Sequence, residues 1–192
     1  MQLLIQLLSD KGVLFDSGLT AEEVYRIETR YDVAFPPDLK ALLQKALPMS
    51  DGFVNWRLGL ESEVENEKVL ERLGWPLEGM LFDVQWNGLW IKIWGDKPDS
   101  VEDQFQRVRE KFKVLPKLIP IYSHRYIPSR PYESGNPVFS VYQMDIIYYG
   151  YDLATYLANE FQIELPKEFD LLENPKREIE FWSNWVDEGS RI

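Results

Sequence analysis

Hydrophobic residues recur at helical spacing near the start of the chain. After Thr20, the residues Val24, Ile27 and Tyr31 repeat every three or four positions, which predicts a helix with one buried face. Thr20 and Glu23 match a capping box, in which each side chain accepts from a backbone N–H at the helix start. The sequence therefore predicts that this helix begins directly after Thr20.

A second helix is predicted to follow the Pro36-Pro37-Asp38 step. Proline suits the first helical turn because a backbone N–H at that position would have no acceptor within the helix. Asp38 complements the positive end of the helix dipole. Asp51-Gly52 then predicts a turn. The short apolar run Leu3–Leu8 predicts a helix or strand that packs on the body of the protein. Leucines form the apolar face of the second helix: Leu39, Leu42, Leu43 and Leu47.

The middle of the chain mixes strand and helix signals. Phe53–Leu60 has the pattern of a strand. Ser62 and Glu65 suggest a capping box, which predicts a helix that runs to about Leu73. The following Gly74-Trp75-Pro76 is expected to end that helix, because proline cannot continue the hydrogen-bond ladder.

A β-hairpin is predicted next. Met80–Gln85 and Leu89–Gly95 have the composition of two strands, and Asn87-Gly88 between them is a strong hairpin turn. In that hairpin Trp90 and Trp94 would share a face, because side chains of a strand alternate between its two faces.

The second half of the chain predicts further helices and strands. Since they do not alternate in the βαβ manner, we expect an α+β fold with a mainly antiparallel sheet flanked by helices. The length fits one domain, residues 1–192. The elements are, in order, a helix capped by Ser100, a strand at Leu118–Tyr122, a loop at His124–Pro137, strands at Val138–Gln143 and Asp145–Tyr149, a helix capped by Asp152, and a last helix from Asn174-Pro175 with Ile179, Trp182, Trp185 and Val186 facing inward.

Composition narrows the classes of function. The 192 residues include no cysteine, which excludes disulfides, thiol catalysis and cysteine zinc sites and fits a cytoplasmic location. The net charge of −11 repels phosphate groups, so we expect no binding of nucleic acid and no membrane association. A basic protein surface would instead be attracted.

Catalytic motifs are absent from the sequence. The single histidine, His124, would have to serve every histidine role, and no nucleophile elbow, P-loop or dinucleotide fingerprint occurs. We therefore expect no catalytic residue, no cofactor and no metal site. An alternative is a carbohydrate-active enzyme, in which two carboxylates act as general acid and general base beside aromatic side chains that stack on the sugar. The candidates for that reading are Glu78, Asp83, Asp96 and Asp145, near Trp75, Trp86 and Trp94.

The segment Leu118–Tyr151 is the most unusual part of the chain. It contains seven tyrosines together with Arg125 and Arg130, and tyrosine and arginine are favoured at binding hot spots. It could equally be a structural loop that covers one end of the sheet. If it is an interface, the residues expected to form it are Tyr122, His124, Arg125, Tyr126, Tyr132 and Tyr142.

The order of these motifs resembles a known family. The capped first helix, the step Tyr31–Leu39 (YDVAFPPDL), the Asp51-Gly52 turn and the strand Leu118–Ile121 (LIPI) are similar to motifs of the SUKH superfamily, the yeast cell-wall (glucan) synthesis regulator-like proteins. The resemblance covers residues 19–161 as a family-like core, which leaves residues 162–192 as a C-terminal helical extension.

The resemblance implies a curved, mainly antiparallel sheet beside helices, and a role that is not enzymatic. Bacterial members of the family are immunity proteins that neutralise a polymorphic toxin, so it implies a protein partner such as a basic toxin domain. The yeast members imply the alternative of a regulatory or scaffold protein. Two departures are visible: Ser123–Pro128 and a long insertion replace a short turn of the family, and Asp51-Gly52 replaces Asn-Gly.

Overall fold

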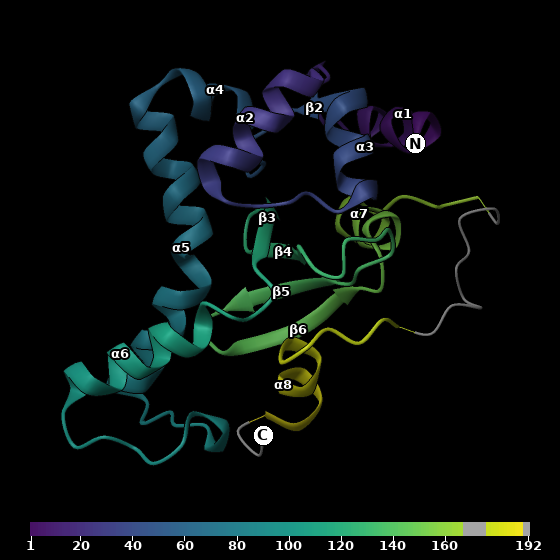
Figure 1. Ribbon diagram of the computed structural model, residues 1–192. Helices are drawn as coiled ribbons and strands as arrows, with labels where there is room; N and C mark the ends of the chain where they lie inside the picture. The colour runs from purple at the N-terminus through teal and green to yellow at the C-terminus, as the bar shows by residue number, and fades with distance from the viewer. Residues whose placement is uncertain (167–175, 190–192) are drawn as a thin grey trace.

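A four-stranded antiparallel sheet lies at the centre of the molecule, with helices packed on both of its faces (Figure 1). The computed structural model describes residues 1–166 and 176–189. The fold is α+β, as the sequence predicts. The four strands pair in sequence order: β3 (Leu118–Tyr122), β4 (Arg125–Pro128), β5 (Val138–Tyr142) and β6 (Asp145–Gly150).

The N-terminal part of the chain is mainly helical and confirms several sequence predictions. The side chains of Thr20 and Glu23 form the expected capping box, and Pro37 occupies the first helical position of its helix. A second, two-stranded antiparallel sheet joins β1 (Phe15–Ser17) to β2 (Ala46–Pro48). The elements are α1 (Gln2–Asp10), β1 (Phe15–Ser17), α2 (Ala21–Tyr31), α3 (Pro37–Lys45), β2 (Ala46–Pro48) and α4 (Trp56–Glu61).

The first hydrophobic cluster lies on one face of the four-stranded sheet. It joins Ile119 and Ile127 of the sheet to the N-terminal helices and to α7 (Leu153–Phe161). Trp56 is buried in this cluster, with its ring centroid 5.1 Å from that of Phe35. As predicted, α7 is capped by Asp152.

The second hydrophobic cluster lies on the other face of the sheet. Leu118 and Tyr126 are buried there, although their chain neighbours Ile119 and Ile127 belong to the first cluster. This alternation follows from the geometry of a strand, whose successive side chains point to opposite faces. The cluster is closed by three helices: the C-terminal half of α5 (Glu63–Trp86), α6 (Val101–Phe112) and α8 (Trp182–Glu188).

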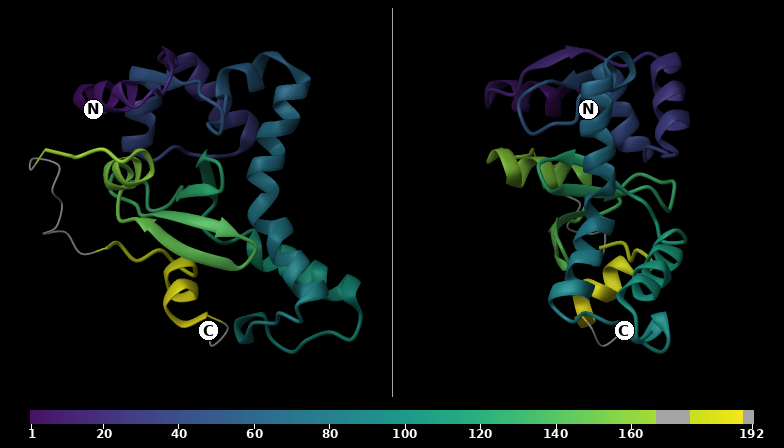
Figure 2. Two further views of the ribbon diagram at one scale, coloured as in Figure 1. Left: turned by 180° about the vertical axis from the view of Figure 1, so that it is seen from behind. Right: turned by 90° about the vertical axis from the view of Figure 1, so that its left-hand side faces the viewer.

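Two helices lie where the sequence predicts other structure. The predicted strand Phe53–Leu60 is wrong: α4 occupies most of it, because the Asn55 side chain accepts from the Leu58 N–H and starts a helix. The predicted helix end near Leu73 is also wrong, since α5 continues through Pro76 to Trp86. The long helix α5 runs along one side of the molecule and links the two clusters (Figure 2, right).

The predicted hairpin is wrong as well. Met80–Gln85 belongs to α5, and Leu89–Gly95 forms a loop that contains only the short 3-10 helix η1 (Lys92–Trp94). Gly88 does adopt a positive φ of 69°, but it ends a helix there instead of turning a hairpin. The Trp90 and Trp94 rings do meet, with centroids 5.3 Å apart.

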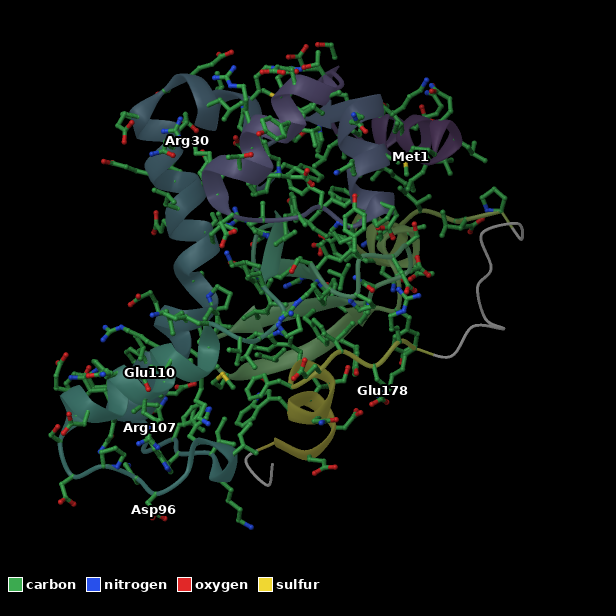
Figure 3. All side chains as sticks on the ribbon, in the orientation of Figure 1. Met1, Arg30, Asp96, Arg107, Glu110 and Glu178 are labelled. Atoms are coloured by element: carbon green, nitrogen blue, oxygen red, sulfur yellow. The ribbon has the colours of Figure 1, made fainter. Side chains whose placement is uncertain are left out.

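Polar contacts tie the helices of the second cluster to each other and to the sheet. Arg107 of α6 lies below its helix, facing the loop that ends in η1 (Figure 3), and its Nη1 donates to the Trp94 carbonyl over 2.9 Å. In α8, Trp182 donates to the Pro116 carbonyl and Trp185 to the Met144 carbonyl, over 2.8 and 2.7 Å. Indole N–H groups therefore anchor α8.

One capping prediction differs in detail, and one predicted boundary lies outside the described residues. Ser62 precedes α5, but its side chain makes no capping hydrogen bond. The predicted start of the last helix, Asn174-Pro175, lies outside the described residues, and Lys176–Glu180 are not helical. Three of the residues that the sequence predicts to face inward here, Ile179, Trp182 and Trp185, are buried, and Val186 is half-buried.

In the described part of the chain, no helix is long and apolar enough to cross a membrane.

Candidate functional site

A hollow of about 310 Å³ opens between α5 and two hairpin turns of the sheet. Ser123 and His124 form the turn between β3 and β4, and Tyr142 ends β5 at the turn into β6. The first residue of each turn has a positive φ, 45° at Ser123 and 55° at Gln143, which is uncommon for residues other than glycine. We call this hollow the α5 cavity, and its lining residues are Arg72, Trp75, Ser123, His124, Tyr126 and Tyr142.

Arg72 holds three segments together at the cavity. Its Nη1 donates to the Gly52 carbonyl over 3.3 Å, and its Nη2 donates to the Ser123 carbonyl. Its Nε–H is buried and has no partner among the described residues. Gly52 must be glycine, because its φ is 96° and a Cβ there would lie 2.5 Å from the Tyr122 ring.

Tyr126 explains how α5 continues through a proline. Pro76 has no N–H, so the carbonyl of Arg72, four residues earlier, lacks its helical donor. The Tyr126 hydroxyl donates to that carbonyl over 2.9 Å. Burial raises the pKa of Tyr126 to about 12, so the hydroxyl keeps its proton at neutral pH. Tyr126 thus fixes α5 on the sheet, and it also lines the cavity.

His124 contributes a neutral ring to the cavity. Partial burial lowers the pKa of His124 below its usual 6.5, and the charges of Arg125 and Arg72 lower it further, against an opposing effect of Glu160. Its Nδ1 lies 3.1 Å from the Ser123 hydroxyl. At neutral pH the imidazole is therefore uncharged and available for hydrogen bonding or stacking.

The structure brings together three of the six predicted interface residues. His124, Tyr126 and Tyr142 line the α5 cavity. Tyr122 packs instead against Phe53 and Phe161, with ring centroids 4.9 and 5.3 Å away.

The remaining two predicted interface residues lie elsewhere. Arg125 is buried, pairs with Glu160 over 3.0 Å and lies 3.7 Å from the Tyr149 ring, so it fastens α7 to the sheet. Tyr132 lies beside α3, where the Lys40 ammonium is 5.6 Å from its ring.

Arg72 and Trp75 line the cavity but are not among the predicted interface residues; the sequence singles out Trp75 only as an aromatic neighbour of the carboxylates considered for an enzyme. Both lie on α5, in the stretch where the sequence predicts a helix end and a break. The helical spacing of Trp75, Phe82 and Trp86, which are seven and four residues apart, is a signal that could have placed Trp75 on a continuous helix, whereas no such signal singles out Arg72.

The carboxylates considered for an enzyme do not line the cavity in the described part of the chain. Asp83 is buried, and its carboxylate accepts from the Met144 N–H over 2.9 Å and from the Asn87 amide over 2.5 Å. The bond from Met144 docks α5 on the turn between β5 and β6, and the bond from Asn87 lies at the C-terminal end of α5 itself. Glu78, Asp96 and Asp145 are exposed. Within the described ranges no group of three His, Asp or Glu side chains could hold a metal ion.

Comparison with known proteins adds no relative. No protein-family model matches the chain, and no curated protein or solved structure matches it either. The likeness to the SUKH superfamily therefore rests on the short motifs of the sequence alone.

Proposed function

We propose that this protein is a protein-binding module and that it acts as a cytoplasmic immunity protein, which neutralises a polymorphic toxin. The observation that supports the proposal most is the α5 cavity. Its lining joins the exposed aromatic side chains Trp75 and Tyr142 to Arg72. Tryptophan, tyrosine and arginine are the residue types that dominate binding hot spots, particularly where they surround a pocket.

The charge of the chain indicates the kind of partner. With 32 acidic and 21 basic residues, the protein attracts a basic surface such as that of a nuclease toxin. Charge complementarity raises the rate of association and makes it sensitive to salt. The motifs that resemble the SUKH superfamily point to the same role.

The test is binding to the toxin domain encoded beside the gene. We expect a tight complex by isothermal titration, protection of cells that express the toxin, and weaker binding at high salt. Tyr142→Ala should weaken the complex by about tenfold or more. Tyr25→Ala on α2 is the matched control, because Tyr25 is 67% exposed and Tyr142 is 58% exposed. Absence of binding and of protection with every neighbouring toxin domain would refute the proposal.

A further inference from the structure

One face of α5 carries a row of exposed aromatic side chains. Trp75, Phe82 and Trp86 are seven and four residues apart, so they lie on the same side of the helix. Their side chains are 39%, 44% and 67% exposed. Single exposed apolar residues are common, whereas a continuous row of them marks an interaction site. We call these three residues the aromatic row.

A row of carboxylates runs beside the aromatic row. Glu67, Glu71 and Glu78 are all exposed and lie four and seven residues apart on the adjacent side of the helix. Across the described ranges, none of the three forms an ion pair, whereas the nearby Glu65 pairs with Lys68 over 2.7 Å. We call these three residues the acidic row.

We propose that this face of α5 binds a basic amphipathic helix of the partner protein. The apolar side of that helix packs on the aromatic row, and its Lys or Arg side chains pair with the acidic row. The aromatic row spans about 16 Å, the length of three turns of a partner helix. Trp75 belongs both to the row and to the α5 cavity, so an apolar side chain at one end of the partner helix enters the cavity. The proposal rests on the proposed function and specifies which surface performs it.

Charge favours a basic partner over a second copy of this chain. Two copies that met through α5 would each bring an acidic row and a net charge of −11 to the interface, and like charges placed face to face oppose association. An anionic membrane surface is repelled for the same reason.

The uncovered side of α5 faces the viewer in Figure 2, right, where no other helix lies in front of the middle of α5.

The proposal can be tested with two synthetic amphipathic peptides of roughly 18 residues, about five helical turns. Both carry Leu at the apolar positions, and one carries Lys and the other Glu at the polar positions. Isothermal titration should show that the wild-type protein binds the Lys peptide and not the Glu peptide. Phe82→Ser/Trp86→Ser should weaken binding of the Lys peptide by about tenfold or more, and so should Glu71→Lys/Glu78→Lys.

The matched control is Glu102→Lys/Glu110→Lys on α6, which makes the same change of charge at two exposed positions. It should leave most of the affinity for the Lys peptide. An equal loss in the control variant would overturn the proposal, because binding would then follow net charge alone. Circular dichroism and thermal melting confirm that each variant is folded before its affinity is compared.

Two further outcomes would also overturn the proposal. One is a wild-type dimer in analytical ultracentrifugation that Phe82→Ser/Trp86→Ser abolishes, because a second copy would then cover the row. The other is an affinity for the toxin that these α5 variants leave unchanged. That result would overturn the α5 surface but would leave the proposed function standing. Conversely, if the Lys peptide binds as expected but no neighbouring toxin does, the immunity role fails and the basic-helix surface stands.

Discussion

The helices α2 and α7 of the first cluster differ from α5, whose C-terminal half closes the second cluster, in the interactions that determine their course. Both α2 and α7 begin at signals within their own sequence, namely the Thr20–Glu23 capping box of α2 and the Asp152–Thr155 capping box of α7. On the side of the second cluster, α5 depends on groups that are distant in sequence. The Tyr126 hydroxyl replaces the donor that Pro76 lacks, fifty-four residues away from the carbonyl it serves.

Two other positions of α5 show the same dependence on distant groups. Gly79 packs so closely on the turn between β5 and β6 that a Cβ would lie 2.7 Å from the Gln143 Cα. Asp83 accepts from the Met144 N–H in that same turn. Tertiary contacts therefore hold a helix whose local sequence contains a proline and two glycines. The same contacts bring Arg72, Trp75 and Tyr142 together at the cavity.

The largest expected effects compare the buried tryptophans of the two clusters. Trp56→Ala and Trp182→Ala should each lower the free energy of unfolding by about 3–5 kcal/mol, because each leaves a large cavity. Urea unfolding followed by circular dichroism measures both losses. Each variant should still unfold in one transition, since the sheet belongs to both clusters. Separate transitions would show that the two clusters are independent units.

A pair of glycines in α5 gives the next largest effect. Gly79→Ala should destabilise the protein by about 2 kcal/mol, because the new methyl group meets the backbone of Gln143. Gly74→Ala is the control: apart from its chain neighbours and the backbone of its own helix, no atom lies within 4 Å of a Cβ there, so it should stabilise the helix by about 0.5–1 kcal/mol. Thermal melting of both variants checks the prediction, and equal shifts would argue against close packing at Gly79.

A double-mutant cycle tests the bond that replaces the proline donor. Tyr126→Phe should cost about 1–2 kcal/mol, because it leaves the Arg72 carbonyl without a donor. In a Pro76→Ala background the alanine N–H can serve that carbonyl, so the cost of Tyr126→Phe should become much smaller. The four free energies of unfolding give the coupling between the two positions. Additive effects would mean that the Tyr126 hydroxyl does not replace the proline donor.

The smallest predicted effect concerns the first cluster and depends on pH. The Arg57 guanidinium, 2.6 Å from the carboxylate of Glu23, lowers the pKa of Glu23 from 4.5 to about 2, against an opposing effect of burial. The stability that this interaction adds is complete above pH 4.5 and disappears as the pH falls towards 2. Glu23→Gln should therefore cost about 1 kcal/mol at pH 7 and progressively less below pH 4.5.

Urea midpoints at several pH values, with the exposed Glu22→Gln as the control, measure this pH-dependent difference. A difference between wild type and Glu23→Gln that stays constant from pH 7 to pH 3 would contradict the assignment to the Glu23–Arg57 pair.

The contrast between the clusters also explains what the sequence could predict. The α+β class, β3, β5 and the capped helices follow from local patterns, because their start signals and periodicities are contained in short segments. The course of α5 could not be predicted, because Pro76, Gly79 and Asn87-Gly88 all indicate breaks unless the distant partners of the helix are known.

The candidate site likewise has one part that local sequence predicts and another that depends on distant contacts. His124, Tyr126 and Tyr142 could be singled out from the tyrosine-rich segment. Tyr132 lies apart from these three residues because of the way the loop between β4 and β5 folds. Arg72 and Trp75 lie next to them only because α5 continues through the predicted break. Strand alternation places the adjacent residues Arg125 and Tyr126 on opposite faces of the sheet, so only Tyr126 reaches the cavity.

Hydrogen–deuterium exchange of the protein, alone and bound to its neighbouring toxin domain, tests most directly the claim that the α5 side of the molecule is the binding surface. Binding should slow exchange in residues 72–86 of α5 and in the turns at Ser123–His124 and Tyr142–Gln143, and leave α2 unchanged. Protection confined to α2 and α3, with no change in α5, would contradict the account.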